Sequence, residues 1–287
     1  GSDSAGGPGN GGPVGTWIGG MIRSGSQDGR NGGADIDFET DGLSTGIDYR
    51  LNDEFVIGGG FGYGKDENAI GSDGSRVDGD ARTVAIYASY HPGTWFMDTL
   101  LGYQSLDYDL RRYVTANGGL VNGQRDGSQK FASVSVGTDI VRENMLLTPY
   151  ARLDVAQARL DAYTETGDPI YALSFDDMDV DTTTGNLGMR VDWQLEQTWG
   201  RFTPQVRLEY QHDFSGRSDA VIRYADLIGG PVYGLSSTGF DNNRFMVGLG
   251  ALFDLKSGWG WRLEYRGQVG SDGESDNGVS VNVQKQF

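Results

Sequence analysis

The 287-residue chain contains no cysteine, only two histidines, and only 23 lysines and arginines against 40 aspartates and glutamates. The absence of cysteine suits a protein that passes through an oxidising compartment such as the periplasm. The net charge of −17 opposes binding to nucleic acids and to anionic phospholipids, so no nucleic-acid partner is expected. An enzyme would need a nucleophile or paired acids together with a base, and the chain offers two histidines for that role.

Long apolar runs are also missing. The mean hydropathy is −0.44, and no stretch of 18 apolar residues could form a membrane-spanning helix. Strands of a membrane barrel escape this test, because only every second residue faces lipid. The 47 glycines and the 11% aromatic content suit curved strands and interfacial girdles. Residues 1–13, whose Gly-Ser start resembles a cloning remnant, are rich in Gly, Ser and Pro and are expected to form a flexible linker before one domain at 14–287.

The last ten residues show what the composition hides. Val279, Val281, Val283 and Phe287 share one parity, and the residues between them are mostly polar. Successive side chains of a strand point to opposite faces, so this segment has one apolar and one polar face. Ten residues at about 3.3 Å each, tilted by about 40°, climb roughly 25 Å, the height of the apolar band of an outer-membrane barrel. A terminal Phe287 predicts an assembly signal at the barrel's closing strand.

The same alternation recurs along the chain and predicts an all-β fold, a transmembrane barrel of 12 antiparallel strands. The facing parity of the first segment stays open. The segments are Val14–Gly25, Leu43–Tyr49, Phe55–Tyr63, Val84–Tyr90, Trp95–Gln104, Ser133–Ile140, Leu147–Val155, Asn186–Trp193, Gln205–Gln211, Phe245–Leu255, Trp261–Gln268 and Gly278–Phe287.

The connections alternate strictly between short and long, which is the layout of an outer-membrane barrel with periplasmic turns and extracellular loops. An even strand number then places both termini in the periplasm. The short turns are expected at 51–53, 91–94, 142–145, 196–200 and 256–260. The long loops are expected at 26–37, 65–79, 112–126, 160–178, 215–240 and 271–277. A soluble twelve-stranded sandwich is the alternative, but aromatics at strand ends and alternating loop lengths favour the barrel.

Charged side chains occupy the parity opposite the apolar residues and are predicted to line the lumen. Twelve strands about 4.8 Å apart close at a backbone diameter of roughly 24 Å, which leaves a lumen of about 10–12 Å. The wall serves either as paired structural ladders or as a hydrated surface for a passing polar chain. The predicted lining residues are Asp98, Asp139, Arg152, Asp154, Arg190, Asp192, Arg207, Glu209, Asp254, Arg262, Glu264 and Arg266.

At this level of detail the chain resembles the autotransporter translocator (β) domain of type V secretion, over about residues 14–287. The segments that carry the resemblance are 94–103, 147–151, 174–177, 187–190, 202–214 and the final Phe287. The resemblance implies a monomeric barrel in outer-membrane lipid of a Gram-negative cell, inserted by the barrel-assembly machinery. It also implies export of an N-terminal passenger to the cell surface, without catalysis or cofactors. Family members usually carry a lumenal helix upstream, and residues 1–13 have no helical period.

Several alternatives remain open from the sequence alone. The chain could be a stand-alone channel or an adhesin acting through its loops. His212 near the outer rim could serve a hydrolase, although an interfacial histidine explains it as well, and His91 lies in a turn. The acidic run 176–181 could bind a cation, but an extended run lacks the convergent loop oxygens of a calcium site. The glycines of 58–64 are expected to admit a neighbouring aromatic ring or allow tight curvature.

Overall fold

The computed structural model describes residues 13–27, 35–215, 218–224, 233–237, 243–270 and 275–286. Within these residues the regular structure consists of β-strands alone. No helix in the described ranges is both long enough and apolar enough to span a membrane, a test that does not bear on strands. Phe287 and residues 1–12 lie outside the described residues, so the assembly signal and most of the expected linker are not placed.

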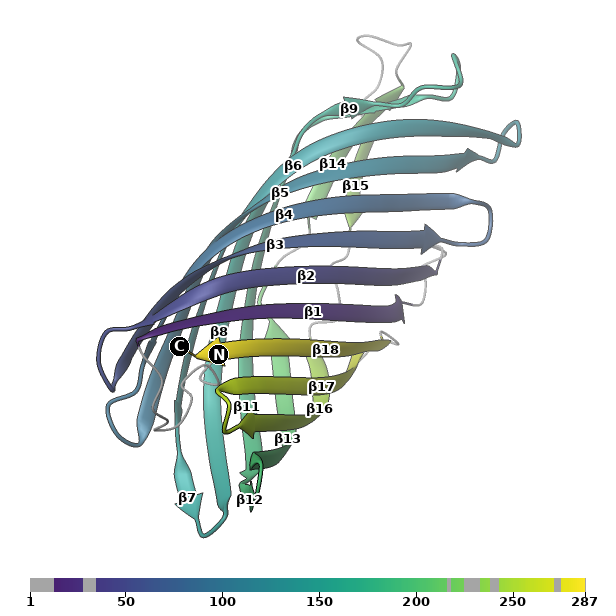
Figure 1. Ribbon diagram of the computed structural model, residues 1–287. Coiled ribbons are helices and arrows are strands. Elements are labelled where there is room, and N and C mark those ends of the chain that lie inside the picture. The colour runs from purple at the N-terminus through teal and green to yellow at the C-terminus, as the bar shows by residue number, and fades with distance from the viewer. Residues whose placement is uncertain are drawn as a thin grey trace.

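Twelve antiparallel strands, each hydrogen-bonded to the next, form a closed barrel, as the alternation predicts (Figure 1). The barrel closes where β1 pairs with β18, from Gly15 opposite Gln286 to Ser26 opposite Ser275. The barrel strands are β1 (Val14–Gln27), β2 (Ile36–Arg50), β3 (Phe55–Ile70), β4 (Ser75–Tyr90), β5 (Trp95–Val114), β6 (Gly119–Thr138), β8 (Met145–Leu160), β11 (Met178–Trp193), β13 (Gly200–Asp213), β16 (Asn243–Leu255), β17 (Trp259–Gly270) and β18 (Ser275–Gln286).

Two barrel strands are continued by short segments at the end where the tight turns lie. β6 continues past Asp139 as β7 (Ile140–Arg142), and β11 continues past Gln194 as β12 (Leu195–Gln197). The register carries through the first interruption, because both β6 and β7 pair with β8. Each pair of segments therefore counts as one wall strand.

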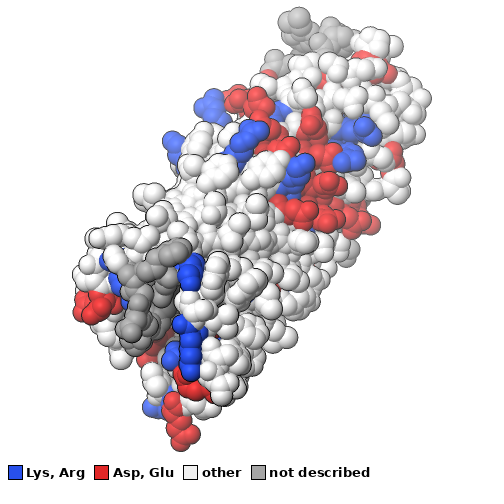
Figure 2. Space-filling model, viewed as in Figure 1, with Lys and Arg blue, Asp and Glu red and all other residues white. Residues whose placement is uncertain are grey.

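The predicted apolar parity faces outward. Ile86 and Leu187 are 63% and 64% exposed, which only a surrounding apolar phase makes favourable. Figure 2 shows the result as a broad belt without charged side chains, bounded by charged zones. The structure also settles β1, where Ile18 and Ile22 are exposed on the outer face and Trp17 points into the barrel.

The five predicted tight turns are confirmed at one end of the barrel, where the chain also enters β1 and leaves β18 (Figure 1). Four of them hold a residue with positive φ: Gly93 (98°), Glu143 (50°), Gly200 (153°) and Gly258 (80°). Glu143 has the positive φ of the left-handed region, which non-glycine residues rarely adopt, and this matches a two-residue hairpin turn between β7 and β8. Lys285 lies on the outer face here and donates to the carbonyl of Ser257 at 2.5 Å.

At the opposite end, two expected loops are wrong. Residues 65–79 and 112–126 are mostly strand, because β3 and β4 run on to a turn at 71–74 and β5 and β6 to one at 115–118. Outside the lipid both faces of a strand meet water, so the apolar alternation fades while the backbone ladder continues. The 26–37 and 271–277 connections fall largely outside the described residues.

The two longest connections also contain strands. β9 (Tyr163–Thr164), β10 (Leu173–Phe175), β14 (Ser218–Tyr224) and β15 (Tyr233–Ser237) form a second sheet in the order β15-β14-β10-β9. The expected loops 160–178 and 215–240 are therefore partly strand. The sequence also leaves open that the 215–240 connection, which is rich in apolar residues, folds inward and plugs the lumen. That alternative concerns residues that include 225–232, which lie outside the described residues.

The polar lumen as a candidate functional site

One side of the lumen is built from glycine and aromatic residues. Trp17 of β1 reaches over β2 and β3, and its Nε1 donates to the Tyr87 hydroxyl of β4 at 2.6 Å. That hydroxyl in turn donates to Asp48 of β2. A methyl group at Gly58 would overlap the Tyr87 ring, and one at Gly60 would lie 3.0 Å from the Trp17 ring. The inward glycines of β3 therefore admit aromatic rings, as the sequence predicts.

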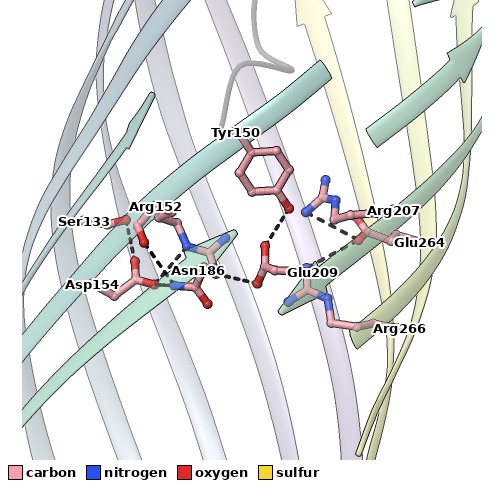
Figure 3. A network of polar contacts seen from close by, with 9 residues as sticks. All are labelled: Ser133, Tyr150, Arg152, Asp154, Asn186, Arg207, Glu209, Glu264 and Arg266. Atoms are coloured by element: carbon pink, nitrogen blue, oxygen red, sulfur yellow. Dashed lines mark hydrogen bonds and ion pairs between the residues drawn. The ribbon is translucent and has the colours of Figure 1, made fainter. Parts of the chain in front are cut away.

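The other side is built from ion pairs, and Figure 3 shows the largest group, centred on Glu209 of β13. The Glu209 carboxylate accepts from the Tyr150 hydroxyl at 2.5 Å and from Arg152 Nη2 at 2.9 Å. Arg152 Nε also donates to Asp154 at 2.9 Å. The Asp154 carboxylate also accepts hydrogen bonds from the Ser133 hydroxyl at 2.6 Å and from Asn186 Nδ2 at 2.8 Å. Every charge of this group has at least one partner, so the wall presents few free charges.

Two smaller groups follow the same rule. Arg190 pairs with Asp192 at 3.0 Å, and Gln205 donates to the second Asp192 oxygen at 2.6 Å. Glu264 of β17 lies 3.7 Å from Arg207 and 3.4 Å from Arg266. Arg190, Asp192 and Glu264 are all buried. Because opposite charges share each group, the cost of removing them from bulk water is partly offset.

These two sides enclose a cavity of about 750 Å³. Seven of the residues predicted from the sequence to line the lumen border it: Asp98, Arg152, Arg190, Arg207, Asp254, Arg262 and Glu264. The others lie in the side-chain groups behind or beside it: Asp139, Asp154, Asp192, Glu209 and Arg266. Asp139 sits near the tight turns, where it accepts from Thr148 at 2.7 Å and lies 3.1 Å from His91 Nε2.

Sequence reasoning missed Trp17, Met21, Tyr87 and Phe96, which also border the cavity. Tyr87 and Phe96 could have been found, because they occupy the parity opposite outward residues that the alternation identifies. Trp17 and Met21 could not, because several glycines in their strand blur its two faces. The lumen is therefore asymmetric, and its aromatic side cannot be predicted from the pattern of charged residues in the sequence.

A further group of interacting side chains lies beyond the barrel wall, at the end opposite the tight turns. Arg112 binds Glu165 through two bonds of 2.8 Å and 2.6 Å and also donates to the Tyr171 carbonyl at 2.9 Å. The Tyr163 ring stacks on Phe175, with centroids 4.5 Å apart. Burial, and then the neighbouring Glu165 carboxylate, raise the pKa of Tyr163 to about 12. This group packs the β9–β10 connection onto the long β5–β6 hairpin.

The residues weighed for other chemistry have ordinary surroundings. His212 hydrogen-bonds Asn243 at 2.9 Å and packs edge-on against Phe214. In the acidic run, Asp177 pairs with Arg159 at 3.0 Å on an exposed face. Among the described residues, no group of three acidic or histidine side chains could hold a metal ion. The described part of the lumen is thus a cavity whose charged side chains are largely paired with one another.

Comparison with known proteins assigns this architecture. The family model for the autotransporter beta-domain matches residues 16–266. The translocator domain of the autotransporter NalP from Neisseria meningitidis is 17% identical and superposes with a TM-score of 0.81, covering 100% of this chain and 92% of that one. The beta domain of the Bordetella autotransporter BrkA is 19% identical, with a TM-score of 0.73 and coverage of 96% and 100%. At these identities the two structures support the fold.

Some of the curated relatives carry enzymatic names. Esterase EstA of Pseudomonas aeruginosa is 25% identical over 288 residues, which cover 94% of this chain and 42% of EstA. Lipase 1 of Photorhabdus luminescens is 25% identical over 181 residues, which cover 61% of this chain and 27% of the lipase. The chain thus spans less than half the length of either relative.

Proposed function

The chain belongs to the autotransporter beta-domain family, and from this premise we propose that its lumen passes an N-terminal passenger to the cell surface as an extended polypeptide. As a member it is a translocator barrel of the Gram-negative outer membrane. The observation that carries the proposal is the cavity of about 750 Å³ inside the closed wall, which charged residues line on one side and aromatic residues on the other. A cavity of this size suits one extended chain and excludes a folded domain.

The pairing of the wall charges supports this role. A polypeptide in transit carries unpaired backbone groups and side chains of either sign, and a free lumenal charge would retain some of them. Glu209, Asp192 and Glu264 are already bound by Tyr150, Gln205 or arginines within the wall. Their attraction for a passing chain is correspondingly reduced, while water in the cavity can hydrate the moving backbone.

The same premise sets the proposed orientation and partners. The tight turns and both termini face the periplasm, and the long β3–β4 and β5–β6 hairpins stand outside. The exposed apolar belt contacts the lipid of the outer membrane. The barrel works as a monomer, and the barrel-assembly machinery inserts it. The remaining partner is the barrel's own passenger, and no nucleic acid takes part.

We assign no catalysis to the barrel itself. The esterase and lipase names belong to relatives more than twice as long as the matched segment, so their activities are attributed to the parts that this chain does not cover. Hydrolysis of a short-chain ester by the folded chain, lost in His212→Ala, would overturn this assignment. Equal, background-level turnover in both proteins is the expected result.

Display on living cells tests the export proposal. The chain is expressed behind a signal peptide with a flexible epitope tag at its N-terminus, and antibody binding to intact cells is measured. We expect surface exposure of the tag, and loss of that exposure when the tag is replaced by a small domain locked by a disulfide. A tag that stays periplasmic although the barrel is folded and inserted would contradict the proposal.

A further inference from the structure

A polar groove of about 480 Å³ lies on the outer face of the extended hairpins, apart from the lumen. The strand register places its residues in two neighbouring rows that run across β4, β5 and β6. Each row ends on a threonine of the adjoining segment, Thr164 in β9 or Thr166 just after it. The first row is Arg76, Arg111, Asn122 and Thr166. The second is Asp78, Asp109, Gln124 and Thr164. These eight side chains are polar, and Leu110 and Gly123 also line the groove. Its volume falls in the range of about 300–1,000 Å³ that small-molecule sites occupy.

The charges in this groove are arranged against the usual preference of a sheet. Arg76 lies directly opposite Arg111, and Asp78 lies directly opposite Asp109. Like charges in directly opposed positions destabilise an antiparallel pair. Exchanging the two residues on one strand would pair every charge, so the observed order concentrates two guanidiniums at one point and two carboxylates beside it.

After the contacts within the groove are counted, one hydrogen-bond donor group and one acceptor atom have no partner there. Arg76 binds Asp78 Oδ2 at 2.6 Å, and Gln124 donates to Asp109 at 2.9 Å. Asp78 Oδ1 is shielded from solvent and has no hydrogen-bond partner among the described residues. The Arg111 guanidinium likewise makes no hydrogen bond or ion pair with any residue that the structure describes. The shielded Asp78 oxygen is out of reach of a ligand, so the charged group that the groove leaves open is the Arg111 guanidinium.

From this juxtaposition we infer that the groove binds an acidic sugar. Its carboxylate would lie between Arg76 and Arg111, where two guanidiniums offer charge-assisted bonds. A hydroxyl group would donate to the exposed Asp109 carboxylate, which accepts only, while Asp78 holds Arg76 in position. The amide and hydroxyl groups of Asn122 and the threonines can both donate and accept, which suits neighbouring sugar hydroxyls.

The position of the groove supports a sugar over a lipid phosphate. Tyr103 marks the outer aromatic girdle, being 45% exposed on the lipid-facing parity of β5. Arg111 lies eight residues further along the same strand, which at about 3.3 Å per residue and the usual tilt raises it roughly 20 Å above that level. Lipid phosphates end well below this height, whereas cell-surface saccharides extend through it. This step uses the orientation proposed above.

Binding of trigalacturonic acid to the full chain, refolded in detergent free of lipopolysaccharide, tests the inference by calorimetry. We expect binding that maltotriose, a neutral trisaccharide, does not reproduce. Arg111→Gln is expected to weaken binding about tenfold, the effect of losing one charge-assisted hydrogen bond, and Asp78→Asn to weaken it as well. Arg159→Gln removes an outward cation outside the groove and is expected to leave binding unchanged.

Gel shifts on heating verify that each variant is folded. Equal binding of maltotriose, no binding of the acidic trisaccharide, or unchanged affinity in folded Arg111→Gln would overturn the inference. Adding purified lipopolysaccharide distinguishes the source of the sugar, since competition with trigalacturonic acid indicates the cell's own surface and its absence indicates an external saccharide. Because the measurement is made in detergent, a failure of the export proposal would not affect it.

Discussion

At the scale of single residues, the parity of each strand decides what a substitution costs. Val281 of β18 faces lipid, and its neighbour Ser280 borders the lumenal cavity opposite Glu264. We expect Val281→Arg to lower the free energy of unfolding by about 2–4 kcal/mol, the cost of an arginine near the bilayer midplane. Ser280→Arg, which gains Glu264 as a neighbour, is expected to cost much less. Refolding into lipid vesicles over a urea series measures both, and equal costs would contradict the assigned faces.

The burial of an ion pair likewise determines how much stability is lost when one partner is removed. Glu209 is 5% exposed and accepts from Tyr150 and Arg152, so Glu209→Ala leaves the Tyr150 hydroxyl without its acceptor and Arg152 with Asp154 as its remaining partner. We expect a loss of about 1–3 kcal/mol in unfolding free energy. Asp177→Ala breaks an exposed pair with Arg159 and is expected to cost under about 1 kcal/mol. Urea unfolding of the two variants compares them, and a larger loss for Asp177→Ala would contradict the ranking.

At the scale of elements, the β9–β10 connection forms its own small core outside the barrel wall. Because burial raises the pKa of Tyr163 to about 12, the folded connection favours the neutral phenol. Its contribution to stability is complete below the ordinary tyrosine pKa of about 10 and is lost as the pH rises through 12. The tyrosinate absorbance of the wild type minus that of Tyr163→Phe should therefore titrate near pH 12. A difference signal centred near pH 10 would show that this ring is solvated.

The elements also show what the sequence could and could not predict. Where one face meets lipid, the period of two is plain, as in Val279, Val281 and Val283, and the strands follow. Above the lipid, β3 to β6 remain strands although Asp66, Glu67 and Asn68 show no apolar period. The Trp17–Tyr87 contact joins residues 70 positions apart in different strands, which no local pattern encodes. The lumenal charges were readable by parity, but their partners depended on the register between strands.

At the scale of the whole molecule, the lumen is expected to conduct ions. The cavity of about 750 Å³ is polar in part, and carboxylates exceed basic residues by 40 to 23 along the chain. We therefore predict conductance in planar bilayers with mild cation selectivity that shrinks as salt screens the charges. A closed trace that opens on deletion of residues 226–237 would show instead that this connection plugs the pore.

The Trp17 contact has a consequence for the order in which the barrel assembles. The seam between β1 and β18 joins residues such as Arg23 and Asp276, which are 253 positions apart in sequence, whereas most other wall contacts join neighbouring hairpin strands. Closing so long a loop carries the largest chain-entropy cost of any pairing in the wall. Trp17 secures β1 to β4 without help from β18. We therefore expect a curved open sheet, with its first strand already fastened, to precede the final joining of the two ends.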